Sequence, residues 1–455
     1  MRLSTPTPTK CPHDSPVPRL DCRVRQPRFL GNGWLWRLAG LLIAAGLLTA
    51  CQPPAWPSWP TGIWPSSEPT PTPALVTTEL HFATWEASEP VNDYFRARVS
   101  AYGVAAPDTH VALQVLPNYA TRLRTALDSD RPPDVIRLNA FALTALVEKG
   151  LIAPLPEPLA ARTNLSPLLR AMGEVDGNLY CVPHEINTLA LVYNPALFDA
   201  AQLAYPTAEW SWETLRSAAE TLTDATAGRY GLILPADFSR WLPFLYQAGG
   251  SVTDAGYTTM TINSPEGATA LQFYTDLVLE GMAATPATAG NSWAGEAFAQ
   301  GHAAMVIEGN WIIPYLAQQA PALGYAVVPL PTGPVGKATV AFVNCYAIAA
   351  GAADIAAAGQ FIEFLTSADS QRQWLPLTAA LPVQAELQGA WSTMYPTQLA
   401  FIQGLAYAYP WRFYATFQPV VDQVNGGIQQ VYDGFILADS VLVDAETKGN
   451  EQIQP

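Results

Sequence analysis

Tryptophan, carboxylate and amide side chains recur in this chain where short apolar strands are predicted to end. Trp85 and Glu86 follow one apolar run, Asn139 follows another, and the turn Glu-Gly-Asn-Trp at 308–311 ends a third. Flat aromatic rings pack on the C–H face of a pyranose, while carboxylates and amides accept hydrogen bonds from its hydroxyl groups. Residues of these types are therefore the ones that a sugar-binding site needs.

Alternating strands and helices are predicted to position these residues. We expect strands at 80–85, 111–116, 134–138, 189–193 and 231–234, and helices at 91–102, 120–129, 140–149, 211–223, 264–281, 293–300, 354–366, 369–374 and 417–435. The helix at 264–281 is well signalled, with Ser264 as its cap, Pro265 in its first position and Gly281 at its end. This alternation predicts an α/β fold with mostly parallel strands, whose ligands bind beyond the carboxyl ends of the strands.

The stretch from Leu38 to Cys51 predicts export and membrane attachment. Arg25, Arg28 and Arg37 precede about a dozen apolar residues, a length that suits a secretory signal better than a membrane-spanning helix. Small residues before Cys51 resemble a bacterial lipobox, so we expect residues 1–50 to be a lipoprotein signal peptide and Cys51 to be lipidated. The alternative is a cleaved signal followed by an incidental cysteine.

Residues 51–78 are predicted to tether the body to this anchor. Eight prolines lie between residues 52 and 78, with no periodic apolar face. Such a segment cannot build a core and is typical of an extended linker. The roughly 400 residues that remain after signal removal exceed what one core usually supports, which predicts two lobes.

Charge and cysteine content limit the partners. The chain has a net charge of −15, and loss of residues 1–50 removes seven basic and two acidic residues, leaving −20. This charge argues against nucleic acid as the main partner. Beyond Cys51 only Cys181 and Cys345 remain, which provide neither a disulfide framework nor a metal site. They either pair in the export compartment or stay as two buried thiols.

No motif for catalysis or metal binding is found. The sequence lacks GxSxG, HExxH and phosphate-cradling patterns, and its histidines at 13, 81, 110, 184 and 302 have no metal-ligand spacing. His184 beside Glu185 imitates an acid–base pair, but neighbours on a strand point to opposite faces. We expect no enzyme activity, no cofactor and no metal.

Several segments occur in an order that is similar to a known family. They are PDVI at 133–136, GNLYCVP at 177–183, LALVYNPALF at 189–198, SPEGATALQFYTDL at 264–277, AFAQGHAAMVIEGNW at 297–311 and FIEFLTSADSQRQW at 361–374. Together they resemble the extracellular solute-binding proteins of ATP-driven importers, in the family that includes maltose-binding protein. The resemblance runs from about residue 79 to residue 435.

The resemblance implies a type II periplasmic-binding-protein fold, in which two mostly parallel sheets with helices on both faces are joined by a multi-strand hinge. Lobe I would comprise 79–184 and 345–385, lobe II would comprise 185–344 and 386–438, and 439–455 would be a flexible tail. The chain would cross between lobes near 183–188 and again near 342–346. Because Cys181 and Cys345 lie beside these crossings, the resemblance slightly favours their pairing.

The resemblance also implies a ligand cleft between the lobes. Residues that fall on it, or end strands beside it, form the predicted ligand-binding set: Trp85, Glu86, Asn139, Glu185, Trp241, Glu308, Trp311, Asn344 and Trp411. Trp210, Trp212, Trp374 and Trp391 are interpreted as packing residues. The implied function is capture of an oligosaccharide or glycoside by a monomeric, lipid-anchored protein outside the cytoplasm, which delivers it to the permease subunits of an ABC transporter.

Other ligands of the same family remain open at this point. A polyamine would need several carboxylates between aromatic walls, which Glu86, Glu185 and Glu308 with the tryptophans would offer. A glycerol phosphate would need clustered basic residues, and iron would need paired tyrosines such as Tyr407 and Tyr409. A lipid-anchored glycan hydrolase would need two carboxylates about 5 to 10 Å apart.

Overall fold

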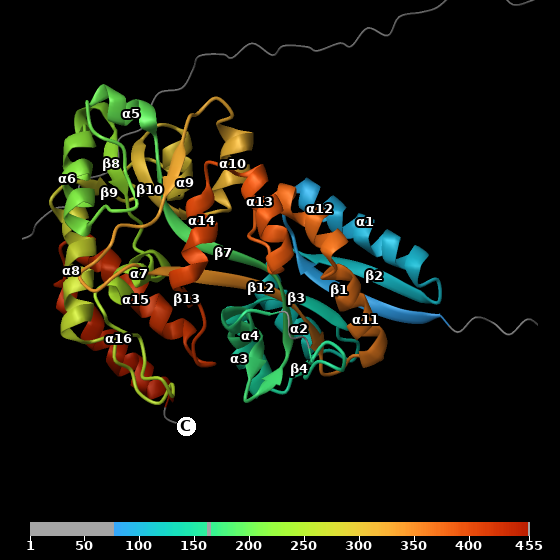
Figure 1. The fold of residues 1–455 in the computed structure, drawn as a ribbon. Helices are drawn as coiled ribbons and strands as arrows, with labels where there is room; N and C mark the ends of the chain where they lie inside the picture. Colours follow the sequence, from blue (N-terminus) through green and yellow to red (C-terminus); the bar gives the residue numbers. More distant parts are fainter. Residues whose placement is uncertain (1–76, 162–164, 454–455) are drawn as a thin grey trace, which may run out of the picture. The chain divides into compact units, whose positions relative to one another are not determined.

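Two long strands, β7 (Cys181–Tyr193) and β12 (Thr339–Ala349), run through the middle of the sheet. The computed structural model describes residues 77–161 and 165–453, so the predicted signal peptide, Cys51 and the predicted tether up to residue 76 lie outside the described residues, whereas Thr78 at the end of the predicted tether is the first residue of β1 (Thr78–Trp85). The sheet has 11 strands, and its main path follows the order β2-β1-β3-β12-β7-β10-β8-β9. Figure 1 shows β7 and β12 between the two groups of strands that they join.

The two central strands change partners along their length. In β7, residues 181–188 pair antiparallel with β12, and residues 189–193 pair with β10 and β11. In β12, residues 344–348 pair with β3, whereas residues 339–341 pair with β13. Both predicted crossings, at 183–188 and 342–346, therefore lie where β7 and β12 pair with each other. The lobe boundaries themselves stay a prediction.

The first group of strands is parallel and carries helices that bury its aromatic residues. Its elements are β1 (Thr78–Trp85), β2 (Thr109–Leu116), β3 (Val135–Asn139), β4 (Ile152–Ala153), α1 (Glu89–Ala105), α2 (Tyr119–Leu127), η1 (Ala140–Ala142), α3 (Leu143–Glu148), α4 (Pro167–Gly173), α11 (Ile355–Leu365) and α12 (Ala368–Thr378). Both β2 and β3 pair with β1 in parallel. A small hairpin, β5 (Glu174–Val175) with β6 (Asn178–Leu179), follows α4. Phe82, Phe95 and Trp374 are fully buried in this core.

The second group has the same construction. Its elements are β8 (Tyr230–Ile233), β9 (Ala283–Ala284), β10 (Ala303–Gly309), β11 (Ala326–Val328), α5 (Pro195–Ala200), α6 (Trp212–Leu222), α7 (Phe238–Gln247), α8 (Pro265–Leu279), α9 (Ala294–Ala299) and α10 (Ile312–Gln319). The C-terminal region adds α13 (Gln388–Met394), α14 (Leu399–Gly404), β13 (Ala408–Pro410), α15 (Gln418–Tyr432) and α16 (Ala438–Ile453). Strands β8, β9 and β10 are parallel, and β10 is antiparallel to β7.

Local signals predicted the helices that begin at polar caps. The Ser211 hydroxyl accepts a hydrogen bond from the Thr214 N–H at 3.3 Å, and Ser264 caps α8 through the Gly267 N–H at 3.1 Å. Gly281 follows α8 with φ +78°, a left-handed conformation that favours glycine and ends the helix. These predictions are confirmed.

The C-terminal segment differs from its prediction. Residues 439–455 were expected to be a flexible tail, but residues 438–453 form α16. Val441, Leu442 and Ala445 lie on one face of this helix and are fully buried, because α16 packs against α15 and α8. The segment has a low mean hydropathy because its apolar residues form only a narrow stripe among charged and polar ones. For this reason the sequence did not predict a packed helix here.

The structure resolves the alternative left open for the cysteines. Cys181 of β7 and Cys345 of β12 form a disulfide, with Cα atoms 5.7 Å apart. In the ladder Cys345 is opposite Pro183, and Cys181 is opposite Ala347, so the bond runs diagonally between neighbouring strands. It therefore cross-links the two strands that connect the two halves of the sheet.

We expect removal of this disulfide to destabilise the protein. The bond closes a loop between residues 164 positions apart, and a cross-link of this kind restricts the unfolded chain. A variant with both Cys181→Ala and Cys345→Ala should unfold with a free energy about 2 to 4 kcal/mol lower than the oxidised protein. Denaturant unfolding measures the change, and dithiothreitol should affect only the protein that retains both cysteines. Equal midpoints with and without reductant would contradict the assignment.

Candidate functional site

A cavity of about 490 Å³ lies beyond the ends of β1 and β3, between α2 and α3. Three predicted site residues, Trp85, Asn139 and Asn344, line it together with Tyr119 at the start of α2. Tyr119 was not among the residues predicted from the sequence, although it comes three residues after the end of β2, the strand that pairs in parallel with β1, which ends at Trp85. The carboxyl ends of parallel strands meet at one edge of a sheet, which explains why Trp85 and Asn139 lie there, and Asn344 of the antiparallel strand β12 joins them because it is paired with Asn139.

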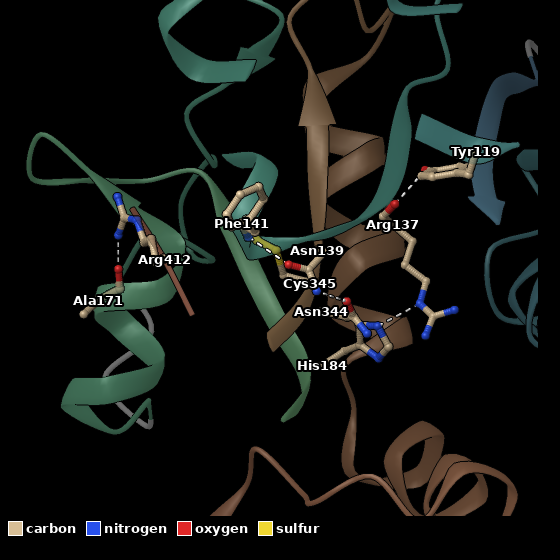
Figure 2. Close-up of a disulfide and its surroundings, with 10 residues drawn as sticks. Tyr119, Arg137, Asn139, Phe141, Ala171, His184, Asn344, Cys345 and Arg412 are labelled. Atoms are coloured by element: carbon tan, nitrogen blue, oxygen red, sulfur yellow. Dashed lines mark hydrogen bonds between the residues drawn. A yellow bond between two sulfur atoms is a disulfide. The ribbon is translucent and has the colours of Figure 1, made fainter. Parts of the chain in front are cut away.

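Strand register joins the two amides of this cavity to Glu185. Asn344 lies opposite Asn139 on β3 and opposite Glu185 on β7. The Asn139 Nδ2 donates to Asn344 Oδ1 at 3.1 Å, and Asn344 Nδ2 donates to Glu185 Oε1. Asn139 also caps η1, because its Oδ1 accepts from the Phe141 N–H at 2.9 Å. Figure 2 shows this chain of amides from Phe141 to Asn344.

The Glu185 carboxylate is paired inside the protein. Arg137 Nη2 donates to its Oε1 at 3.1 Å, and the Trp374 indole N–H donates to its Oε2 at 2.7 Å. Both ions are buried, with side chains 3% and 6% exposed. With Asn344, three donors occupy this carboxylate. We therefore interpret Glu185 as a residue that supports the site from within the protein. It is not positioned to contact an ammonium group of a ligand.

His184 is held as a neutral acceptor in the same network. Burial, together with the nearby Arg137 charge, lowers the pKa of His184 well below its usual value. Its Nε2 accepts a hydrogen bond from Arg137 Nε at 3.0 Å, which Figure 2 shows, and its ring stacks on Tyr346 with centroids 4.4 Å apart. This arrangement provides no proton for acid–base catalysis.

Arg137 also supports the indole of Trp85. Its guanidinium carbon lies 3.6 Å from the centroid of the Trp85 ring, 4.9 Å from that of Trp374 and 5.3 Å from that of Phe95. Tyr119 approaches Trp85 edge-on, with centroids 5.7 Å apart. Trp85 is half-buried and lines the cavity, so its ring is held in place from within the protein. Glu86, one residue further along, is exposed.

Glu308 and Trp311 form a second supported pair. Glu308 is buried, and its Oε2 accepts from Arg240 Nη2 at 2.8 Å and from the Trp311 indole N–H at 2.9 Å. The Trp311 ring lies flat over Gly309, where an added Cβ would approach it to within 2.2 Å. Position 309 must therefore be glycine, because a side chain there would collide with the Trp311 ring. Like Trp85, Trp311 is half-buried and fixed from behind.

Trp411 lies between the two halves of the molecule. Its backbone N–H donates to the Ala341 carbonyl at 2.8 Å, which continues the pairing of β13 with β12. Its ring stacks on Phe141 of η1 at 5.6 Å and contacts Phe342 of β12 at 5.4 Å. Phe342 in turn contacts Trp311 at 5.7 Å. Phe342, which the sequence analysis missed, therefore joins the two predicted tryptophans.

The residue after Trp411 adds a polar link to the first group of elements. Arg412 donates a hydrogen bond to the Ala171 carbonyl of α4, as Figure 2 shows, and the Thr144 hydroxyl donates to the Phe413 carbonyl at 3.4 Å. Phe413 and Phe417 belong to the core of the second group. Residues 411–413 thus contact η1, α3 and α4 on one side and α7 on the other.

Trp241 does not lie with the other predicted site residues. It belongs to α7 and is fully buried, where it packs against Phe238 with centroids 5.8 Å apart. Trp241 was assigned to the ligand-binding set through the family resemblance, and no helix was expected at 238–247, where Pro243 lies inside α7 although proline normally disfavours a helix interior. The packing predicted for Trp210, Trp212, Trp374 and Trp391 agrees with their exposed fractions, which do not exceed 9%.

The described residues contain neither a cluster of metal ligands nor a membrane-spanning helix. Across 77–161 and 165–453, no three His, Cys, Asp or Glu side chains gather where they could hold a metal ion. No helix in the same ranges has the length and hydropathy to cross a bilayer. Tyr409, half of the tyrosine pair considered for iron, stacks instead on Tyr246.

The fold is that of a type II periplasmic-binding protein, because two groups of mainly parallel strands are joined by two long shared strands. Half-buried tryptophans lie beside these strands. The chain belongs to the bacterial extracellular solute-binding protein family, whose model matches residues 87–372. This confirms the predicted fold and family. Members of this family are binding proteins, and the chain is a binding protein rather than an enzyme.

Known proteins of this family are similar over most of the chain. The maltotriose-binding protein of Pyrococcus abyssi is 23% identical over 364 residues, which cover 77% of this chain and 76% of that protein. An ABC substrate-binding protein of Listeria monocytogenes, solved with cycloalternan, is 25% identical with a TM-score of 0.76, covering 83% of this chain and 99% of that one. The GacH receptor of Streptomyces glaucescens, solved unliganded and with acarbose, has a TM-score of 0.72 at 23% identity, with coverages of 83% and 99%.

Proposed function

We propose that this protein captures a carbohydrate, an oligosaccharide or glycoside, and delivers it to an ABC importer. The observation that carries the proposal is the set of half-buried rings at Trp85, Trp311 and Trp411, since the carboxylates behind the first two, Glu185 and Glu308, are each paired with an arginine within the protein. Rings with amides beside them suit an uncharged ligand with an apolar face and a hydroxyl rim. The sugar ligands of the relatives from Pyrococcus, Listeria and Streptomyces support the same class.

The internal ion pairs argue against a polyamine. Glu185 is bound to Arg137 and Glu308 to Arg240, so two of the three carboxylates proposed for an ammonium ligand each face an arginine. A cation entering beside either arginine would meet like charge in a poorly screened site. Only Glu86 of the three is exposed. A neutral ligand avoids this repulsion.

The remaining alternatives meet similar obstacles. Arg137 and Arg240 are occupied by carboxylates, and Arg412 donates to a backbone carbonyl, so these three arginines already have partners other than a phosphate. A glycan hydrolase needs a carboxyl group that carries a proton. The Glu185 carboxylate accepts hydrogen bonds from Arg137 and Trp374, and the Glu308 carboxylate accepts from Arg240 and Trp311, so both act as acceptors within the protein.

Ligand capture is proposed to occur by closure of two lobes about β7 and β12. Contacts made only in the closed state would shift the population from open to closed, because a ligand favours the state that it binds more tightly. Residues 411–413 already contact elements on both sides. They are therefore suited to exchange protein contacts for ligand contacts during closure.

The proposed location follows from the N-terminal sequence. We infer that Cys51 is lipidated after removal of residues 1–50 and anchors a monomer outside the cytoplasm. Attachment of this kind would keep the binding protein at high effective concentration near the permease subunits.

The test of the site is the effect of Trp311→Ala on sugar affinity. We expect a loss of about 1 to 3 kcal/mol, the scale of a large aromatic contact, as measured by calorimetric titration with maltotriose and related sugars. Trp293→Ala is the matched control, because Trp293 is also half-buried and its ring also lies over a glycine, Gly295, while it packs on Tyr315. Equal losses in both variants, or none in Trp311→Ala, would remove Trp311 from the site.

A further inference from the structure

The cavity beside Trp85 has a wall that is apolar over most of its extent. An engineered apolar cavity of about 150 Å³ is enough to hold benzene, and this cavity measures about 490 Å³. Water in such a place lacks hydrogen-bond partners, so a ligand group that displaces it gains affinity. Six of the residues that line the cavity have purely hydrocarbon side chains: Ala120, Leu123, Leu138, Ala142, Leu146 and Leu151.

The uncharged polar side chains of this cavity are already engaged within the protein. Tyr119 directs its hydroxyl to the Arg137 carbonyl at 2.6 Å, as Figure 2 shows, and therefore away from a ligand. Asn139 donates to Asn344, which in turn donates to Glu185. Within the described residues this leaves one N–H of each amide for a ligand. That number suits the edge of one sugar unit but not a hydroxyl-rich group that fills the cavity.

Two leucines of the wall are held in place by the way in which helix α3 ends. Gly150 has φ +67°, and its N–H donates to the Val147 carbonyl at 2.8 Å, while the Leu151 N–H donates to the Leu146 carbonyl at 3.0 Å. These bonds form a Schellman motif, which commonly brings apolar side chains at the positions of Leu146 and Leu151 together. The Leu151 carbonyl also accepts from the Ala350 N–H at 2.9 Å, just beyond β12. A wall fixed in this way loses little conformational freedom when a ligand binds.

The remaining residues of the lining define the inner wall and the rim of the cavity. Leu123 of α2 and Leu138 of β3 are buried, so they belong to the inner wall. Arg124 and Lys149 are exposed, so their charged ends reach water while their hydrocarbon stems line the cavity. Two positive charges at the rim repel a cation. A group that enters past them is therefore apolar and carries no positive charge.

We propose that this cavity binds the apolar aglycone of a glycoside, such as an aryl group, while Trp85 and the amides of Asn139 and Asn344 hold the attached sugar. This inference rests on the proposed function, and it narrows the substrate class to glycosides with an apolar aglycone. The two chemically different parts of such a ligand match the two parts of the site. The ring and amides suit the sugar, and the hydrocarbon wall between α2 and α3 suits the aglycone.

The experiment compares calorimetric affinities for methyl maltoside and phenyl maltoside, which share their sugar and differ in the aglycone. The wild-type protein should bind the phenyl compound about tenfold more tightly, because its ring leaves water for an apolar wall. Ala142→Leu fills the cavity from η1 and should reduce this ratio to within about twofold, since the space for the ring is lost. Leu146→Gln makes the wall polar and should also reduce the ratio. Ala145→Leu is the matched control and should keep the ratio, because Ala145 is also half-buried but does not line the cavity.

The possible outcomes separate this proposal from the proposed function. Equal wild-type affinities for the two maltosides, or a phenyl preference that survives Ala142→Leu, would overturn the aglycone site. An equal loss of phenyl maltoside and maltotriose binding in Ala142→Leu would indicate a general sugar subsite and would also overturn it. If Trp311→Ala still weakens maltotriose binding, the proposed function stands without the aglycone site. A wild-type protein that binds neither maltoside would overturn the inference, and a response to spermidine instead would overturn the carbohydrate function as well.

Discussion

Replacing Trp241 by alanine is expected to lower the free energy of unfolding by about 3 to 5 kcal/mol, as measured by chemical denaturation. The side chain is fully buried in the core of the second group of elements and contacts Phe238. Its loss removes apolar burial and leaves a cavity that the surrounding rings cannot fill. The site prediction for Trp241 required instead a loss of ligand affinity with little change in stability.

The controls for Trp241 separate packing from hydrogen bonding. Its indole N–H has no hydrogen-bond partner among the described residues, so Trp241→Phe removes a buried unsatisfied donor along with part of the ring and should cost less than alanine. Phe435→Ala, at a side chain that is 75% exposed, should change stability little. A stable Trp241→Ala variant with reduced sugar affinity would contradict this placement and return Trp241 to the binding site.

Replacing Arg137 by methionine is expected to have a comparable effect, a loss of about 3 to 5 kcal/mol in unfolding free energy. Methionine keeps much of the side-chain volume but leaves the Glu185 carboxylate buried without its counter-ion. It also removes the cation beneath Trp85. Thermal or chemical unfolding of the variant measures the stability loss, and sugar titration measures the effect on the Trp85 side of the cavity.

A second substitution and a surface control complete this test. Glu185→Gln in the Arg137→Met background removes the isolated charge and should recover part of the lost stability. Arg96→Met is the surface control, because Arg96 also pairs with two carboxylates, Glu89 and Asp93, but is 52% exposed. Exposed pairs contribute little, so its unfolding should be nearly unchanged. Similar results for both arginine variants would mean that the buried pair does not support this site.

The sequence predicts the parts of this fold that depend on local signals. Ser211 and Ser264 are followed by amphipathic helices, and both cap them as expected. Trp85 and Asn139 end their strands, and parallel pairing brings both to one cavity. In each case the relevant interactions are close in sequence or follow from a general property of parallel sheets.

The remaining features depend on contacts between distant residues. Arg137 on β3 and Glu185 on β7 are 48 positions apart in the sequence. They come into contact because β12 pairs with both of these strands. The sequence alone therefore left open a polyamine site with Glu86, Glu185 and Glu308 as its carboxylates, which the ion pairs of Glu185 and Glu308 oppose. The disulfide likewise depends on the register of β7 and β12, which composition cannot determine.

The most direct measurement of the central claim is a calorimetric or thermal-shift titration of the protein with sugars, polyamines and glycerol phosphates in parallel. The account predicts saturable binding of at least one oligosaccharide, and no response to spermidine or glycerol 3-phosphate. It also predicts that the sugar response is weaker in Trp311→Ala but not in Trp293→Ala. Failure of every sugar together with a response to spermidine would contradict it.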